Sequence, residues 1–315
     1  MRCLFVRVTG LIDQMGTTGS TSRWSPCSTG EHMRIRATVA AVSGALALSA
    51  LAVPAAQADD GRTWTPDFGF SAPERSNGRM AARAVTATDD LVINKAVVNG
   101  GKPIVVGTTT PKKVTVAITA TDDSGIADAG TILWTGSTME SEDSFGFTQN
   151  EDAATCKAVN AKTSTCTLTV TVDPAWLINS DATSWKVGAA VLSKDGQVVQ
   201  KDAFARAKVQ RLSKLTVNAA PEPVKKGRTI TVTGKLSRAN WETGTYKGYT
   251  GQPVKLQFRK KTSSTYTTVR TIKTNSTGVL KTTAKASVDG YWRYSFAGTS
   301  TTPAVTTAGD FVDVK

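Results

Sequence analysis

Apolar and polar residues alternate along most of the chain after residue 86. One clear example is the series Val114, Val116, Ile118 and Ala120, which is separated by polar or small residues. A period of two is typical of β-strands with one buried face, because successive side chains point to opposite faces of a sheet. Further strands are expected at 91–98, 104–106, 132–134, 166–172, 185–192, 197–199 and 203–209.

The same alternation continues from residue 213 to the C-terminus. Strands are expected at 230–236, 254–258, 269–272, 279–288, 292–296 and 311–314. Asn275 to Gly278 and Asp289-Gly290 are turn sequences between these runs, because Asn, Asp and Gly accept the backbone conformations of tight turns. About seven short strands per hundred residues predict an all-β fold with two tandem immunoglobulin-like β-sandwich domains.

A separate apolar run, Ala37 to Val53, lies nearer the N-terminus. Two arginines precede it and Ala56-Gln57-Ala58 follows it, so residues 33–58 contain the three parts of a secretory signal peptide. The alternative, a transmembrane anchor, needs about 17 to 25 apolar residues and a positive flank after them. We therefore expect cleavage before Asp59, no membrane insertion after cleavage, and a secreted protein that is extracellular or associated with the cell wall.

The position of the signal peptide affects how the N-terminal part is interpreted. Because a signal peptide is recognised at the very N-terminus, residues 1–32 are expected to be a mis-assigned leader. Residues 59–85 contain Ser, Gly and Pro with little apolar periodicity and are expected to form a flexible lead-in. The leader holds the only histidine, His32, and two of the four cysteines. The mature protein is then expected to lack histidine.

Charge divides the rest of the chain into two domains. Residues 86–212 contain 12 Lys and Arg against 14 Asp and Glu, a net charge of −2, whereas residues 213–315 contain 17 against 5, a net charge of +12. We expect an acidic first domain and a basic second domain with these bounds. A basic surface attracts anionic polymers.

Two cysteines remain in the first domain. Cys156 and Cys166 enclose nine residues between two expected strands. In an exported protein such a pair is expected to form a structural disulfide, which stabilises the fold by about 2 to 3 kcal/mol. A redox pair usually has the closer C-x-x-C spacing, and a zinc site needs more ligands than two thiols without histidine.

The expected lack of histidine bears on catalysis. It removes Ser-His-Asp and Cys-His catalytic groups and His-ligated zinc. Paired carboxylates are the remaining hydrolytic option, but the acids of the second domain lie mostly at turns and ends. We predict a protein that is not an enzyme and has no cofactor.

Acidic residues cluster in the first domain, and two interpretations of them stay open. They are solvated loop carboxylates, or Asp122, Asp123 and Asp128 form a calcium site, since Ca²⁺ takes several oxygen ligands from converging loops. The spacing is not that of an EF-hand, because Leu133 stands where the bidentate Glu would be. Calcium is therefore an alternative cofactor.

All five tyrosines of the chain lie in the second domain. Three of its aromatic residues alternate along one strand and are expected in the core: Trp292, Tyr294 and Phe296. Trp241, Tyr246 and Tyr249 lie in a Gly-rich connection, where they are either packed lids or a platform for polymer binding.

A basic triplet, Arg259-Lys260-Lys261, begins a turn in the same domain. It is either a solvated charge run or a set of contacts to an anionic polymer. Cationic and aromatic groups together suit an anionic polymer as partner.

Four segments of the chain carry a resemblance to a known group of proteins: ATDDSGI, NEDAATCKAVNAKTSTC, SKLTVNAAPEPVKKGRTITVTGKLSRANWETGTYKGYTGQPVKLQFRKK and DGYWRYSFAGTSTTPA. They resemble a group of actinobacterial secreted proteins of unknown function with two immunoglobulin-like domains, some of which are labelled calcium-binding protein. The resemblance covers about residues 33–315. It implies export, two domains and the disulfide, but no catalytic residue and no matched calcium ligands.

The sequence thus favours a secreted, non-enzymatic protein that associates with the cell surface or with an extracellular anionic polymer. An anionic cell-wall or extracellular polymer is the expected partner. Sequence-specific nucleic-acid binding is not expected, because no recognition motif is present. A calcium-binding module and a purely structural spacer are the alternatives.

Overall fold

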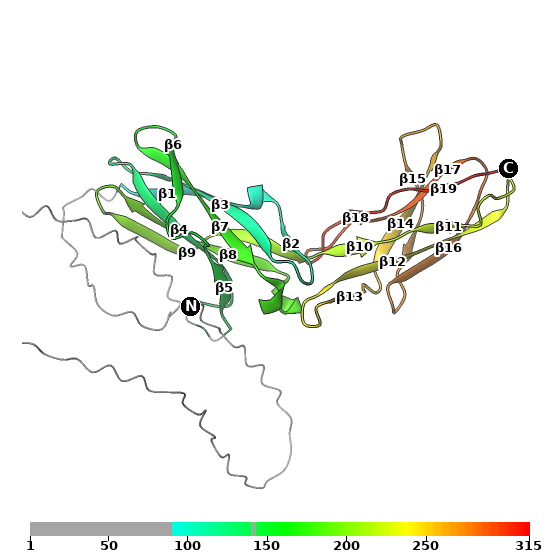
Figure 1. Cartoon of the computed structure of the whole chain (residues 1–315), viewed down its shortest axis with the longest axis horizontal. Coiled ribbons are helices and arrows are strands. Elements are labelled where there is room, and N and C mark those ends of the chain that lie inside the picture. Colours follow the sequence, from blue (N-terminus) through cyan, green and yellow to red (C-terminus); the bar gives the residue numbers. More distant parts are fainter. Residues whose placement is uncertain (1–89, 140, 142) are drawn as a thin grey trace, which may run out of the picture. The chain divides into compact units, whose positions relative to one another are not determined.

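A computed structural model of the chain describes residues 90–139, 141 and 143–315. The leader, the signal peptide and the flexible lead-in predicted for residues 1–85 lie outside the described residues. The described part confirms the predicted all-β fold, since its strands form four sheets that make two tandem immunoglobulin-like β-sandwiches (Figure 1). Within this part, no helix has the length and apolar character needed to cross a membrane.

Nine strands make the first sandwich. They are β1 (Val92–Val98), β2 (Ile104–Val106), β3 (Lys112–Thr121), β4 (Ile126–Thr135), β5 (Phe145–Thr148), β6 (Thr155–Ala158), β7 (Thr163–Val172), β8 (Ser184–Ser193) and β9 (Val198–Arg211). Three short 3-10 helices accompany them: η1 (Asn99–Gly101), η2 (Pro174–Trp176) and η3 (Asn179–Asp181). One sheet has the strand order β1-β3-β7-β6 and the other β2-β9-β8-β4-β5. Neighbouring strands are antiparallel except β2 and β9, which are parallel.

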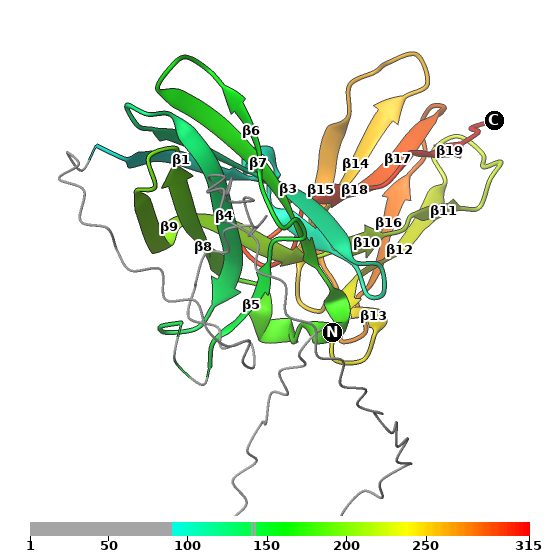
Figure 2. The same cartoon turned by 60° about the vertical axis from the view of Figure 1, so that its left-hand side comes forward.

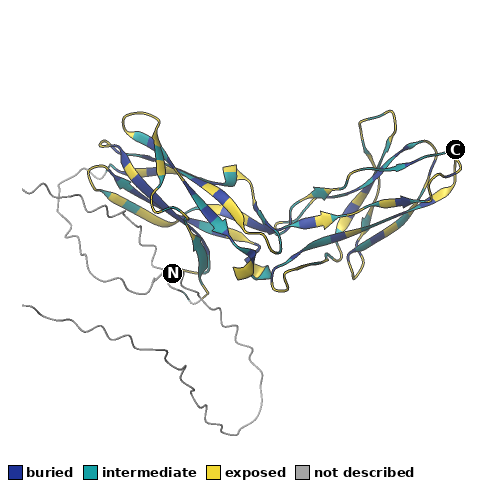
Figure 3. Ribbon diagram, in the orientation of Figure 1, coloured by how far each residue is buried: buried dark blue, intermediate teal, exposed yellow. Residues whose placement is uncertain are grey.

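The inner faces of these two sheets form the first core. Alternate residues of β3 and β7 are buried, as the sequence pattern predicts (Figure 3). Trp185 of β8 is fully buried, and its ring stacks on Phe147 with the ring centroids 5.8 Å apart. β4 and β8 depart from alternation, because their outer faces are also covered, by a small cluster of Ile132, Trp134, Met139 and Ala190.

Cys156 on β6 lies opposite Cys166 on β7, and the two form the predicted disulfide. We expect the double variant Cys156→Ser/Cys166→Ser to lose about 2 kcal/mol of unfolding free energy, because the bridge restricts the unfolded chain. Thermal unfolding with and without a reductant measures this. The reductant should lower the melting temperature of the parent protein and leave that of the double variant unchanged. An unchanged melting temperature of the parent in reductant would contradict a stabilising bridge.

Ten strands make the second sandwich. They are β10 (Ser213–Leu215), β11 (Asn218–Ala220), β12 (Thr229–Asn240), β13 (Thr245–Gly248), β14 (Pro253–Lys260), β15 (Thr267–Lys273), β16 (Val279–Lys285), β17 (Gly290–Phe296), β18 (Val305–Thr306) and β19 (Asp310–Val312). In one sheet the long strand β12 pairs with β10, β11, β13 and β16. The other sheet has the order β15-β14-β17, with β18 and β19 both paired to β17 (Figure 2).

The core of the second sandwich contains the three aromatic residues predicted there. Trp292, Tyr294 and Phe296 all point inward from β17 and are buried. The Tyr294 hydroxyl donates a hydrogen bond to the Val232 carbonyl oxygen, 2.9 Å away, and burial raises the pKa of this hydroxyl. Because inward and outward positions alternate along a strand, Tyr291 and Arg293 must face outward.

Candidate binding surface

Trp241 does not lie on a free surface. Its side chain is 5% exposed and belongs to the hydrophobic cluster that forms the core of the first sandwich. Its indole Nε1 donates a hydrogen bond to the Gly107 carbonyl oxygen, 2.8 Å away. The interpretation of Trp241 as part of a binding platform is therefore corrected, because a buried ring offers no face to a polymer.

Polar groups fix the connection around Trp241. The Asn179 side chain accepts a hydrogen bond from the Trp241 backbone N–H and donates one to the Glu242 carboxylate. Arg211 donates from Nε to the Ala239 carbonyl oxygen, and burial lowers the pKa of this guanidinium to about 10. The end of β12 thus has a structural role.

Tyr246 and Tyr249 are each half-buried and occupied by neighbours. The Tyr246 ring packs against the first core, and Lys214 Nζ lies 3.7 Å from the ring centroid. The Tyr249 ring meets Phe296 edge-on, and Arg238 Cζ lies 3.9 Å from the Tyr249 centroid. For these two residues, as for Trp241, the packed-lid interpretation describes the structure better than a shared platform.

A different set of cationic and aromatic side chains lies on the outer face of the sheet β15-β14-β17. In the strand register, Arg259 lies opposite Tyr291, Gln257 lies opposite Arg293, and Tyr291 in turn lies opposite Phe311. The loop between β14 and β15 adds Tyr266 to this group. We call Arg259, Tyr266, Tyr291, Arg293 and Phe311 the Arg–Tyr face.

The guanidinium groups of this face lie over its rings. Arg259 Cζ is 3.9 Å from the centroid of the Tyr291 ring and 5.4 Å from that of Tyr266. Arg293 Cζ is 3.7 Å from the Tyr266 centroid. Such contacts are attractive, because the face of an aromatic ring carries negative electrostatic potential. They hold both guanidinium groups in defined positions.

The Arg–Tyr face carries uncompensated positive charge. Two ion pairs occur in the described second sandwich, Lys261 with Asp289 at 3.8 Å and Lys315 with Asp313 at 3.6 Å. Neither Arg259 nor Arg293 takes part in an ion pair in the described part of the chain. The face can therefore attract an anion without first breaking a salt bridge.

The predicted basic triplet contributes unequally to this face. Arg259 lies at its centre, and Lys261 lies at its rim with Nζ 5.4 Å from the centroid of the Phe311 ring. Lys260, an exposed residue, points to the opposite side of β14 because successive side chains alternate. Sequence reasoning missed Tyr266, Tyr291, Arg293 and Phe311. Tyr291 and Arg293 alternate with the buried residues of β17, so the sequence pattern could have shown that these two side chains face outward.

The three predicted calcium ligands are engaged separately. Asp122 is buried and accepts hydrogen bonds on Oδ1 from the Ser124 backbone and hydroxyl, while its Oδ2 has no hydrogen-bond partner. Asp123 is exposed and pairs with Lys162. Asp128 accepts from the backbone N–H groups of residues 129 and 154. In residues 90–139, 141 and 143–315, no three His, Cys, Asp or Glu side chains form a group that could hold a metal ion. This geometry gives the predicted site no support.

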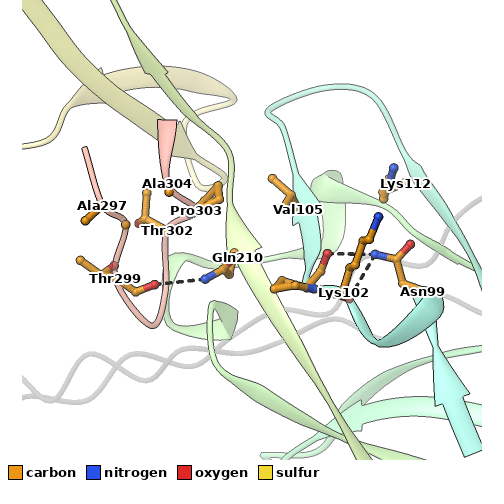
Figure 4. A pocket seen from close by; sticks show the side chains of 12 residues that line it. Asn99, Lys102, Val105, Lys112, Gln210, Ala297, Thr299, Thr302, Pro303 and Ala304 are labelled. Atoms are coloured by element: carbon orange, nitrogen blue, oxygen red, sulfur yellow. Dashed lines mark hydrogen bonds between the residues drawn. The ribbon is translucent and has the colours of Figure 1, made fainter. Parts of the chain in front are cut away.

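An open hollow of about 580 Å³ lies beside Gln210 (Figure 4). The Gln210 side chain donates to the carbonyl oxygens of Thr299 and Ser300, each 3.1 Å away. Lys102 and Lys112 are the charged side chains of its lining, which contains no carboxylate, imidazole or thiol. The other polar side chains of the lining are those of Asn99, Thr299 and Thr302.

Solved structures resemble the chain at low identity. The D00-D0 domain of intimin is 16% identical, with 69% of this chain and 99% of that chain covered and a TM-score of 0.24. A DUF4785 family protein from Legionella pneumophila is 10% identical, with 69% and 53% covered and a TM-score of 0.31. The Yersinia pseudotuberculosis adhesin InvE is 14% identical, with 71% and 58% covered and a TM-score of 0.23. The chain thus spans only part of the last two proteins.

Sequence comparison adds one family. No curated protein matches the chain. Residues 106–191, which run from the end of β2 into β8 of the first sandwich, match the model of a family of unknown function, DUF5707.

Proposed function

We propose that this protein is a secreted, non-enzymatic module that associates with an extracellular anionic polymer through its basic second sandwich. The observation that carries the proposal is the charge contrast, net +12 over residues 213–315 against −2 over residues 86–212. Since ion pairs are few in the described second sandwich, most of this positive charge is free to act on a partner.

A polymer is the partner that fits this charge best. Single contacts between exposed charges contribute little, about 0 to 1 kcal/mol each. A polymer presents many anionic groups at once, so weak contacts add up along one surface. Many like charges also create a long-range field that brings an anionic partner to the protein.

Two further observations support an extracellular, non-enzymatic role. The disulfide between Cys156 and Cys166 is the kind of bond that persists in oxidising compartments. The sequence after residue 58 contains no histidine, which removes the commonest general base. A structural spacer remains the competing function, and a binding measurement separates the two.

We expect the chain from residue 59 to be retained on immobilised polygalacturonate or polyphosphate at low salt, and not on neutral dextran. Retention should fall steeply as salt rises, because exposed charges are screened over about 8 Å at physiological ionic strength. The variant Lys255→Glu/Lys260→Glu/Lys273→Glu, which changes exposed lysines of the second sandwich, should elute at much lower salt.

The matched control is Lys95→Glu/Lys157→Glu/Lys201→Glu, which changes the net charge equally at exposed lysines of the first sandwich. It should elute close to the parent. Equal losses in the two triple variants would show that only total charge matters. No retention of the parent protein on either polymer would favour the spacer.

A further inference from the structure

We infer that the Arg–Tyr face is an oxyanion-recognition site, at which the guanidinium groups of Arg259 and Arg293 bind carboxylate or phosphate groups repeated along a polymer. The inference rests on the proposed function and deepens it. Non-specific electrostatic attraction of a polymer would depend only on the net charge of the second sandwich. Recognition would depend on the planar guanidinium groups at these two positions.

The first argument is the set of N–H donors left unused. An arginine side chain has five N–H donors in a fixed fork. Arg259 uses Nη1 to donate to the Ser263 carbonyl oxygen at 2.8 Å, and Arg293 uses Nε to donate to Gln257 Oε1 at 2.8 Å. Each side chain is therefore oriented by one hydrogen bond and a ring contact, while both Nη groups of Arg293 and one of Arg259 remain for a ligand.

The second argument is the chemistry of the surrounding outward positions. The register places these side chains on the same side of the sheet as the two arginines: Lys255, Gln257, Ser295 and Thr306. None of them is acidic, and Asp289 is paired with Lys261. Two guanidinium groups that share an aromatic neighbour repel each other when no anion is near. A bound oxyanion would remove this repulsion.

The third argument is spacing. Arg259 is the register partner of Tyr291, so Arg293 lies two residues further along the neighbouring strand. Diagonal neighbours of this kind are about 7 to 8 Å apart at the backbone. The Tyr266 ring contacts the guanidinium groups of both Arg259 and Arg293. Successive anionic groups of a linear polymer can therefore engage the two arginines together.

The position of Tyr266 depends on a close backbone approach. A Cβ atom at Gly309 would lie 2.2 Å from the Tyr266 hydroxyl oxygen. Because Gly309 has no side chain, the Tyr266 hydroxyl can occupy this space. The ring that orients Arg293 is held by the fold on one side and by the guanidinium group on the other.

The test is a substitution that keeps the positive charge at both positions and removes the planar guanidinium group with its paired N–H donors. We expect Arg259→Lys/Arg293→Lys, in the chain from residue 59, to bind polygalacturonate or polyphosphate about tenfold more weakly at 150 mM salt. Lysine keeps the positive charge but cannot form two parallel hydrogen bonds to one oxyanion. The control is Arg228→Lys/Arg270→Lys, which changes two exposed arginines outside the face and should bind within about twofold of the parent.

Melting temperatures of both double variants accompany the binding measurement, so that unfolded protein is not counted as a loss of binding. A selective loss on polygalacturonate assigns carboxylate as the ligand group, and a selective loss on polyphosphate assigns phosphate. Equal affinities of the two double variants overturn the inference, while the proposed function stands if the parent protein binds. A parent protein that binds neither polymer refutes the proposed function and the inference with it.

Discussion

Trp241→Ala is expected to lower the free energy of unfolding by about 3 to 5 kcal/mol. The side chain is 5% exposed, lies in the first hydrophobic cluster and donates a hydrogen bond to the Gly107 carbonyl oxygen. Removing the ring leaves a cavity and an unpaired carbonyl oxygen. Differential scanning calorimetry of the chain from residue 59 should show a fall in melting temperature on the order of 10 °C.

Two control variants separate the causes of this loss. Trp241→Phe keeps most of the ring but not the indole N–H, so its cost should be smaller, with about 1 kcal/mol coming from the lost hydrogen bond. Trp176→Ala removes a tryptophan that is 42% exposed, and we expect a small effect, within about 0.5 kcal/mol. If Trp241→Ala melted like the parent protein, the ring would not be part of the core, and the platform interpretation would return.

Trp241 also shows why sequence alone could not decide between a lid and a platform. Its hydrogen-bond partners Gly107 and Asn179 lie far away along the chain. No local pattern links a Gly-rich connection in the second half of the chain to the core of the first sandwich. The alternation of β17, in contrast, is local, and it predicted the burial of Trp292, Tyr294 and Phe296 correctly.

The strand pattern itself was predictable where a sheet has one covered face. The alternation of Val114, Val116 and Ile118 gave the correct buried positions of β3. It was less informative for β4 and β8, because Trp134 and Met139 cover an outer face that is usually solvated. That cover depends on how distant segments pack, and periodicity does not encode it.

The candidate calcium site and the Arg–Tyr face differed in how far the sequence positions of their residues could predict them. Asp122 and Asp123 are neighbours in sequence, but one is buried with Ser124 and the other is exposed with Lys162. A count of nearby acids therefore overestimated their convergence. Arg259 was chosen for its charge, whereas its partners Tyr291 and Arg293 are defined by the register between β14 and β17. The outward positions of Tyr291 and Arg293 follow from the local alternation of β17, but their place beside Arg259 depends on the register of the sheet and needed the structure.

The turn between β15 and β16 provides the second large expected effect. Gly278 has a φ of +80°, and a Cβ atom there would lie 2.4 Å from the Leu236 carbonyl oxygen and 2.7 Å from Gly248 Cα. The Gly278 carbonyl also accepts a hydrogen bond from the Leu236 backbone N–H, so the turn is held against β12. Gly278→Ala is expected to cost about 3 kcal/mol or more, because backbone strain and a backbone clash add.

Gly227 offers a matched control for this substitution. It has the same φ of +80°, but a Cβ atom there would have no neighbour within 4 Å. Gly227→Ala should therefore cost only the strain of a left-handed alanine, about 1 to 2 kcal/mol. Thermal unfolding of the two variants measures the difference, which isolates the clash at Gly278. Equal melting temperatures would mean that the turn moves away from β12 without cost, and that the close packing of Gly278, Gly248 and Leu236 does not stabilise the second sandwich.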